Sequence, residues 1–510
     1  MPGLHYASPV GRWVLTATVL GSGIAALDAT VVGIALPAIG RDFHVGEASL
    51  QWVVDAYTLS LAGLLLLGGT LGDRYGRRKV FLIGTVWFAL ASLLCGVAPN
   101  APTLILARAI QGVGAALLTP GSLSILQASF VKDDRSKAIG AWSGLGGLAT
   151  AVGPFIGGWL ISAVSWRLIF FINLPLAAAV VAISLRHVPE SKAPDETGPL
   201  DVPGAVAITG ALVGITYGLI AVSGDGWTSG TVLASLLGGV ALLAAFLVTE
   251  SRRAEPMLPL GVFGSRQFSA ANAVTFVVYG ALGGTLFLLP TVLQEAAGYS
   301  PLASGAALLP VTLIMLLLSA RSGALAARIG PRLQMSVGPL VIAAGLLLFM
   351  RVAGSGGYIV DVLPAVLVFG FGLAINVAPL TSTALSAVPA EHAGIASAVN
   401  NDVARVAGLI AVAVLPVAAG ITGDSYLHPA ELTQGFQNAV LIAAIACAAG
   451  GLLAFATIRN PPRPQRQPGQ PAPDSTVQPG LHCALDAPPL RGDGVSATSA
   501  QRPAGAPGPA

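Results

Sequence analysis

The sequence has 510 residues, of which 54% are hydrophobic and 10% are charged, and its formal net charge is +3. An ordinary soluble domain carries about 25% charged residues, so this composition excludes a water-soluble globular protein. The apolar residues come in runs of about 20, long enough to cross a hydrocarbon core of about 30 Å. Because the 63 glycines let membrane helices approach closely, we expect an all-α integral membrane bundle and not a barrel.

Charged segments separate fourteen apolar runs, each of which predicts a membrane span. The spans lie near residues 13–36, 50–71, 80–98, 103–126, 138–163, 168–186, 203–222, 230–249, 269–290, 300–320, 335–353, 358–382, 394–419 and 436–458. Lys and Arg gather in alternate loops, which predicts that both termini lie on the cytoplasmic side. The expected location is the cell (cytoplasmic) membrane. The first run is too long for a signal peptide and is expected to be a retained span.

Two charges lie inside these spans. Asp28 falls in the first span and Arg108 in the fourth. A charge at the bilayer centre costs about 2.5 to 3.5 kcal/mol on insertion scales, so Arg108 should face the bundle interior and pair with Asp28. A carboxylate between desolvation and an arginine is suited to bind and release a proton. The alternative is a permanent ion pair that only fixes helix packing.

Asp55, near the start of the second span, is a second candidate for proton coupling. The alternative is that water wets it at the outer interface.

A loop rich in glycine and arginine follows the second span. We predict that it is a gate loop whose acid pairs with an Arg or a helix N-terminus in one conformation only. Its candidate residues are Gly69, Asp73, Arg74, Gly76, Arg77 and Arg78. The alternative is a tight turn that merely carries the positive charge of a cytoplasmic loop.

The gate loop has a second copy. Gly, Leu, Arg, Gly and Arg recur in residues 323–332 at a constant offset of 254, the difference between 323 and 69. Both copies follow a span in a basic loop, so the halves are parallel repeats. The offset fits six helices plus two inserted ones. The predicted regions are an N-terminus (1–12), a six-helix bundle (13–187), two additional helices with linkers (188–268), a second six-helix bundle (269–458) and a disordered cytoplasmic tail (459–510).

Span five carries a cluster of small residues, Gly153, Pro154, Gly157 and Gly158. They remove side-chain bulk and one backbone donor, which favours a surface on which a neighbouring helix can slide. Generic close packing of helices is the alternative.

A few polar and aromatic residues are weak candidates for lining a substrate cavity: Gln111, Trp142, Tyr279 and Asn376. Arg405, with residues 400–402 before it, suggests polar lining in the second half or, equally, packing.

Four stretches together resemble the major facilitator superfamily, in particular its fourteen-span drug:proton antiporter branch. The gate loop matches the GxLaDRxGRK signature, and residues 27–37 are similar to LDxTxVNxALP, with Gly33 in place of Asn. Residues 108–114 resemble RxxQGxG, and residues 153–158 resemble the antiporter motif GPxxGG. The resemblance covers nearly everything up to residue 458.

This resemblance implies a proton-coupled antiporter that exports a small amphiphilic drug or metabolite by alternating access. A dedicated exporter of one endogenous metabolite remains open, as does a non-transporting membrane enzyme or sensor. We expect no catalytic residues, no metal, and no cofactor besides the proton as coupling ion. The expected partners are a small-molecule substrate and the lipid bilayer, with no nucleic acid, and the chain is expected to work as a monomer.

Overall fold

The computed structural model describes residues 4–192, 200–253, 256, 258–352, 357–389, 393–423, 425 and 428–460. From residue 461 onward, the predicted disordered tail lies outside this part of the chain. Within it the fold is helical, and the only extended pairing is an isolated bridge between Leu4 and Phe130.

The first bundle contains the helices up to His187. They are α1 (Pro9–Phe43), α2 (Glu47–Tyr75), α3 (Arg77–Gly96), α4 (Ala101–Ser129), α5 (Lys132–Ala163), α6 (Leu168–Phe171) and α7 (Asn173–His187). Ser8 caps α1 by accepting a hydrogen bond from the Gly11 N–H. The helix extends beyond the predicted span at both ends because the polar residues that flank the apolar run, such as Arg12 and Arg41, are also helical.

An inserted pair follows, formed by α8 (Val202–Asp225) and α9 (Gly230–Arg252). Asp201 accepts a hydrogen bond from the Gly204 N–H at 2.7 Å and so caps α8. The same carboxylate pairs with Arg253 at 2.6 Å, which ties the start of α8 to the end of α9. The two helices pack against each other, and α8 also contacts α2 and α15.

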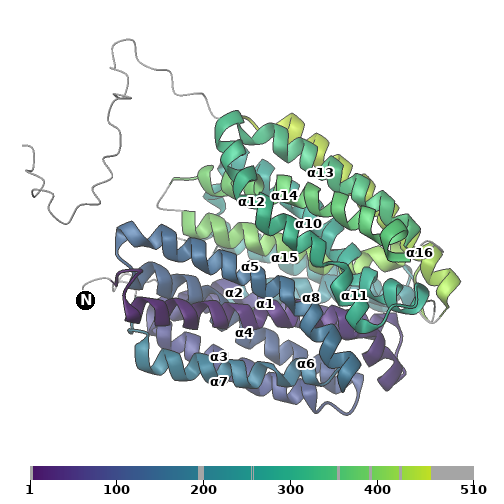
Figure 1. The fold of residues 1–510 in the computed structure, drawn as a ribbon, viewed down its shortest axis with the longest axis horizontal. Coiled ribbons are helices and arrows are strands. Elements are labelled where there is room, and N and C mark those ends of the chain that lie inside the picture. The colour runs from purple at the N-terminus through teal and green to yellow at the C-terminus, as the bar shows by residue number, and fades with distance from the viewer. Residues whose placement is uncertain are drawn as a thin grey trace, which may run out of the picture. The chain divides into compact units, whose positions relative to one another are not determined.

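The second bundle begins at Leu260. Its elements are η1 (Leu260–Gly264), α10 (Arg266–Thr291), η2 (Val292–Ala296), α11 (Pro301–Ala307), α12 (Leu309–Ile329), α13 (Pro331–Leu348), η3 (Phe349–Arg351), η4 (Tyr358–Val362), α14 (Leu363–Ser386), α15 (Ala393–Ala418) and α16 (Pro429–Thr457). Both η2 and η4 are single π-helical turns. The helices of each bundle pack mainly on one another (Figure 1). The predicted region boundaries remain predictions, because contacts join the chain up to Asn460 into one unit.

Thirteen helices of the described residues are long and apolar enough to cross a membrane. The predicted span near 138–163 lies in α5, where the apolar stretch described is Val152–Ala163. Many large apolar side chains point outward, among them Leu106 and Leu237 at 62% and 69% exposure. Lipid is the solvent that suits such a surface, so the chain is a multi-pass membrane protein.

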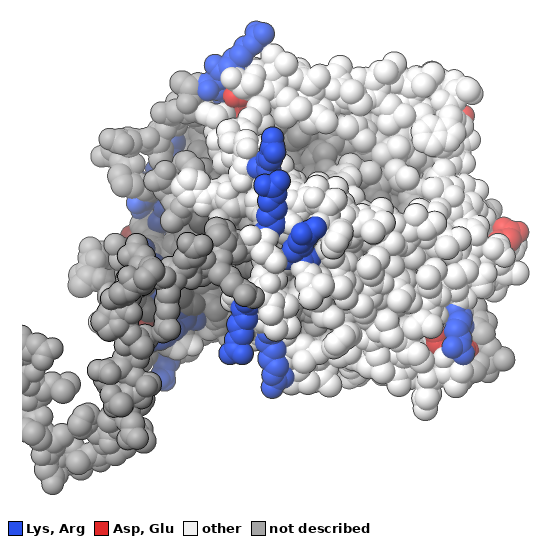
Figure 2. Space-filling model, turned by 90° about the horizontal axis from the view of Figure 1, so that it is seen from above, with Lys and Arg blue, Asp and Glu red and all other residues white. Residues whose placement is uncertain are grey.

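Charge is concentrated at the ends of the helices. Figure 2 shows Lys and Arg gathered toward the side where α1 begins, with a broad uncharged surface between them and the far side. We call the end with the start of α1 and the gate loop the basic end. The opposite end, where α1 terminates at Phe43, is the distal end.

Candidate functional site

An ion pair lies buried inside the first bundle. The Asp28 carboxylate of α1 meets the Arg108 guanidinium of α4, and both side chains are 1% exposed. Arg108 also donates from Nε to the Val53 carbonyl at 3.0 Å, and its Cζ lies 4.3 Å from the Tyr57 ring centroid. A buried guanidinium needs such partners because its desolvation is costly. The predicted contact between Asp28 and Arg108 is therefore present, while its role in proton coupling stays a prediction.

A shell of neutral polar groups surrounds this carboxylate. Gln111 Nε2 and Asn173 Nδ2 donate to Asp28 Oδ1 at 2.9 and 3.1 Å. Ser92 Oγ accepts from the same two amides at 3.3 and 2.9 Å. Because Arg108 donates to Oδ2, Asp28 receives three donors and both oxygens of its ionised form have partners. Sequence reasoning missed the parts played by Ser92 and Asn173, whose only signal is a polar side chain in or beside an apolar run.

Two glycines of the α4 motif bring the helices close enough for these contacts. A Cβ added to Gly112 would lie 2.4 Å from the Tyr57 carbonyl oxygen on α2. At Gly114 it would lie 2.7 Å from the Phe88 backbone nitrogen on α3. Residues 108–114 thus supply both the charge and the close helix packing that it requires.

Asp55 is completely buried in this conformation, and its role in proton coupling stays a prediction. Neither of its carboxylate oxygens has a hydrogen-bond partner among the described residues. Gln51 and Glu47 lie one and two helical turns earlier on the same face of α2, at 1% and 5% exposure. Each also has a buried side-chain oxygen without a described partner. The three acidic or amide side chains thus form a polar stripe along one buried face of α2. Sequence reasoning missed Glu47 and Gln51.

In the gate loop, Asp73 near the end of α2 accepts a hydrogen bond at 2.7 Å from Nε of Arg77, the first residue of α3. Gly76 turns the chain with φ 115°. The loop is closed by Glu190, which follows α7 and accepts from the Arg78 backbone N–H at 3.0 Å. Asp73 therefore pairs within its own loop in this conformation, and its role as a latch stays a prediction.

The second copy of the loop has the same construction. Gly330 turns the chain with φ 87°, and Asn460, just after α16, accepts from the Arg332 backbone N–H at 3.0 Å. Arg332 Nε donates to the Phe455 carbonyl at 2.9 Å, much as Arg78 Nη1 donates to a carbonyl after α7. In each bundle the segment after its last helix caps the helix that follows the loop.

The glycines of the antiporter motif lie in two seams. A Cβ at Gly153 or Gly157 would lie within 2.5 Å of α1 side chains, those of Thr30 and Val31. One at Gly158 would lie 2.5 Å from the Pro301 carbonyl of α11. One face of α5 thus packs on α1 and another on the second bundle.

The polar contacts that the described residues make between the two bundles lie at the distal end. Arg41, near the end of α1, pairs with Glu295 of the π-turn η2. Gln294, beside it, donates to the Ile34 carbonyl at 3.0 Å. We call Arg41, Glu295, Gln294 and Ile34 the distal latch. The structure is therefore closed at its distal end.

The weak cavity candidates lie in different places. Gln111 belongs to the shell of Asp28, and Asn376 is buried against Gly338 of α13 with no described partner for its amide. Both are 0% exposed, so neither faces an open cavity in this conformation. Trp142 donates to Ser22 Oγ at 3.1 Å, and Tyr279 is half-buried. A lining role for the four stays a prediction.

The other bundle has an uncharged polar cluster where α10 meets α15. Asn400 Nδ2 donates to Asn272 Oδ1 at 3.0 Å and to Thr275 Oγ1 at 2.9 Å. Arg405 and Asp402 are half-buried further along α15.

The comparisons with known proteins agree with this architecture. Residues 18–412 match the family model described as Major Facilitator Superfamily. The chain is 36% identical to the tetracenomycin C resistance and export protein of Streptomyces glaucescens, over 79% of this chain and 75% of that protein. It is also 36% identical to a puromycin resistance protein of Streptomyces alboniger, over 88% and 90% of the two chains. A crystal structure of peptide transporter POT in complex with sulfate superposes with a TM-score of 0.64 at 15% identity, over 89% of this chain and 96% of that one.

The two bundles of membrane-spanning helices, together with these matches, identify the chain as a membrane transporter. The chain belongs to the Major Facilitator Superfamily.

Proposed function

We propose that this chain is a proton-coupled antiporter of the fourteen-span branch, which exports a small amphiphilic drug or metabolite by alternating access. The observation that carries the proposal is Asp28, a carboxylate held deep in the bundle by Arg108 and two amides. The names of the two Streptomyces relatives, which include resistance and export, support the direction of transport.

Proton binding at Asp28 would loosen the centre of the first bundle. A carboxylate oxygen that takes up a proton becomes a donor, while all its present neighbours on Asp28 are donors. The shell must then rearrange, and Arg108 loses its counter-ion. The ionised and the protonated forms of Asp28 therefore need different hydrogen-bond partners, and these partners lie on α4 and α7.

The same helix links this centre to the distal end. Ile34 and Arg41 of the distal latch lie on α1 beyond Asp28, as do Thr30 and Val31, against which the antiporter motif packs. A change in α1 on protonation would therefore act on the seam between α1 and α5 and on the distal latch, and would shift the balance between the two open ends. This follows the general scheme in which two halves rock around a site near the midplane.

The orientation belongs to the proposal. Basic loops favour the cytoplasm, so the basic end would be cytoplasmic and the distal end would face outward in the cytoplasmic membrane. The proton would be the only coupling ion, without another cofactor, and the chain would work as a monomer.

The test is transport in proteoliposomes driven by an imposed pH gradient, with Asp28→Asn as the variant. We expect Asp28→Asn to abolish uphill transport but to retain exchange of labelled for unlabelled substrate, because exchange needs no net proton movement. The control is Asp134→Asn, a change at the start of α5 beside Tyr6, which should leave both activities unchanged. If Asp28→Asn still transports uphill, the proton role is wrong. Loss of both activities together with impaired folding would instead assign the ion pair to structure.

A dedicated exporter of a single metabolite is the second candidate, favoured by the relative named for one compound, tetracenomycin C. A panel of unrelated dyes and antibiotics, tested in cells that lack their own pumps, separates the two. Export of several unrelated compounds excludes the dedicated exporter.

A further inference from the structure

A cleft of about 190 Å³ opens at the distal end between the first bundle and the inserted pair. Ala48 and Trp52 line it from the start of α2, and Tyr217, Ile220 and Asp225 line it from the end of α8. A cavity of roughly 150 Å³ accommodates a benzene molecule, so this cleft has room for one ring-sized group. It is separate from the Asp28 centre.

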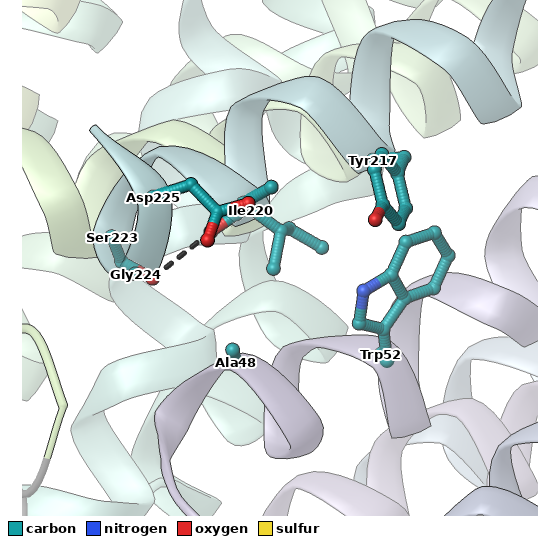
Figure 3. Close-up of a pocket in the computed structure, with 8 residues that line it drawn as sticks. Ala48, Trp52, Tyr217, Ile220, Ser223, Gly224 and Asp225 are labelled. Carbon is teal, nitrogen blue, oxygen red and sulfur yellow. Dashed lines mark hydrogen bonds between the residues drawn. The ribbon is translucent and has the colours of Figure 1, made fainter. Parts of the chain in front are cut away.

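The groups that converge on the cleft are two aromatic rings and a carboxylate. The Trp52 and Tyr217 ring centroids are 6.2 Å apart, with an angle of 47° between the planes. Figure 3 shows Asp225 at one side of the cleft and the Trp52 and Tyr217 rings at the other, with Ile220 between them and Ala48 below. Asp225 is exposed, and no ion pair to it is described. Cations are attracted to aromatic faces and to a carboxylate, and an apolar wall favours an organic cation over a hydrated metal ion.

Trp and Tyr are also common where a helix meets the membrane interface. Two features argue for more than such an anchor here. Trp52 is only half-exposed, and its ring lies against a ring of another helix instead of standing alone. By contrast, Trp227 lies just beyond α8, is 60% exposed and is not part of the cleft. It provides a matched control for an interfacial role.

We propose that this cleft binds monocationic aromatic amphiphiles, with the cationic group at Asp225 and the ring on Trp52 and Tyr217. The site lies on the inserted helix α8, which also packs on α15 of the second bundle. A bound cation would therefore contact a helix that touches both bundles. The inference goes beyond the proposed function, since binding at equilibrium needs no proton gradient.

The experiment measures equilibrium binding of labelled benzyltrimethylammonium to the purified full-length chain in lipid nanodiscs. The background variant is Asp28→Asn, so that the buried acid contributes no charge. We expect Asp225→Asn to weaken binding about fivefold and Tyr217→Leu or Trp52→Leu about threefold each. Asp225→Glu and Tyr217→Phe should retain most of the affinity. Neopentylbenzene, the neutral isostere, should compete only weakly.

Three results would overturn the proposal. One is an affinity that Asp225→Asn leaves unchanged. Another is binding that disappears in the Asp28→Asn background, because the cation would then occupy the central site. The third is an equal loss in Trp227→Leu, which would assign the effect to partitioning at the membrane interface. Each outcome is independent of whether the chain couples transport to protons.

Discussion

The two bundles share a backbone design and differ in charge. Each turns at a glycine with positive φ, Gly76 or Gly330, and each caps the next helix with a side chain from the end of the bundle. That side chain is the charged Glu190 in the first bundle and the neutral Asn460 in the second. The polar clusters differ in the same way, with the ion pair of Asp28 in one and the uncharged Asn400 cluster in the other. The repeat thus preserves packing, while the described buried ion pair between helices lies in the first bundle.

The largest expected effect comes from removing one partner of the buried pair. Arg108→Leu leaves Asp28 buried without its counter-ion, and such changes cost about 3 to 5 kcal/mol. We expect poor folding yield, a marked loss of thermal stability and no transport. The double variant Asp28→Asn with Arg108→Leu should regain much of the stability, measured by unfolding in detergent, without regaining coupled transport. If Arg108→Leu were as stable as the parent protein, the buried Asp28 would not need Arg108 as its counter-ion.

The shell of Asp28 allows a closer comparison of the bundles. Asn173→Ala removes one donor from a buried carboxylate, whereas Asn400→Ala removes bonds between neutral groups. Hydrogen bonds to charged groups are worth about 1.5 to 3 kcal/mol and neutral ones about 1 kcal/mol. Each variant loses two hydrogen bonds, worth about 2.5 to 4 kcal/mol for Asn173→Ala and about 2 kcal/mol for Asn400→Ala. We therefore expect Asn173→Ala to destabilise the protein more, by up to twice as much, and to slow coupled transport about tenfold. Equal losses of stability would show that the charge at Asp28 does not dominate its shell.

The distal latch joins the bundles, so its loss should open the distal end. We expect Glu295→Gln to speed labelling of a cysteine at Ala35→Cys, buried beside Ile34, by an impermeant maleimide severalfold. Arg167→Gln is the matched control, because Arg167 pairs with Asp42 at 2.7 Å at the same end but within the first bundle. If both variants label at the same rate, the distal latch does not hold the closed state.

The sequence predicts what one-dimensional patterns encode. Apolar runs locate the helices, and the cost of a charge in lipid predicts that Arg108 meets Asp28. Neutral polar residues such as Ser92 and Asn173 carry no comparable cost, so nothing in the sequence tells which of them converge on a carboxylate. Gln294 and Glu295 form part of the distal latch through a π-turn after Pro290, and no periodic pattern predicts such a turn.

Residues that cap a helix from a distant segment are equally hard to predict. Glu190 accepts a hydrogen bond from the backbone N–H of Arg78, 112 residues earlier in the chain. Asn460 accepts one from the backbone N–H of Arg332, 128 residues earlier. Both stand in short polar stretches that read only as loops. The sequence shows the internal repeat in the gate loop but not in the capping residues. Glu190 and Asn460 have in common only a side-chain oxygen that accepts a hydrogen bond.

The smallest expected effect comes from removing the charge of one capping residue, Glu190, and adding a charge at the other, Asn460. Glu190→Gln keeps an acceptor for the Arg78 N–H but removes the charge that faces the guanidinium at 3.7 Å. Partly exposed pairs are worth about 0 to 1 kcal/mol, so the loss of stability should be a few tenths of a kcal/mol. Asn460→Asp, which adds a charge near Arg332, should raise stability by a similar amount. Unfolding in detergent at low and high salt is the measurement, since only a charge effect fades as salt is added. If Glu190→Gln lowers the stability and Asn460→Asp raises it, the two caps differ in charge alone. If both variants change the stability in the same direction, the backbones at the two caps differ as well.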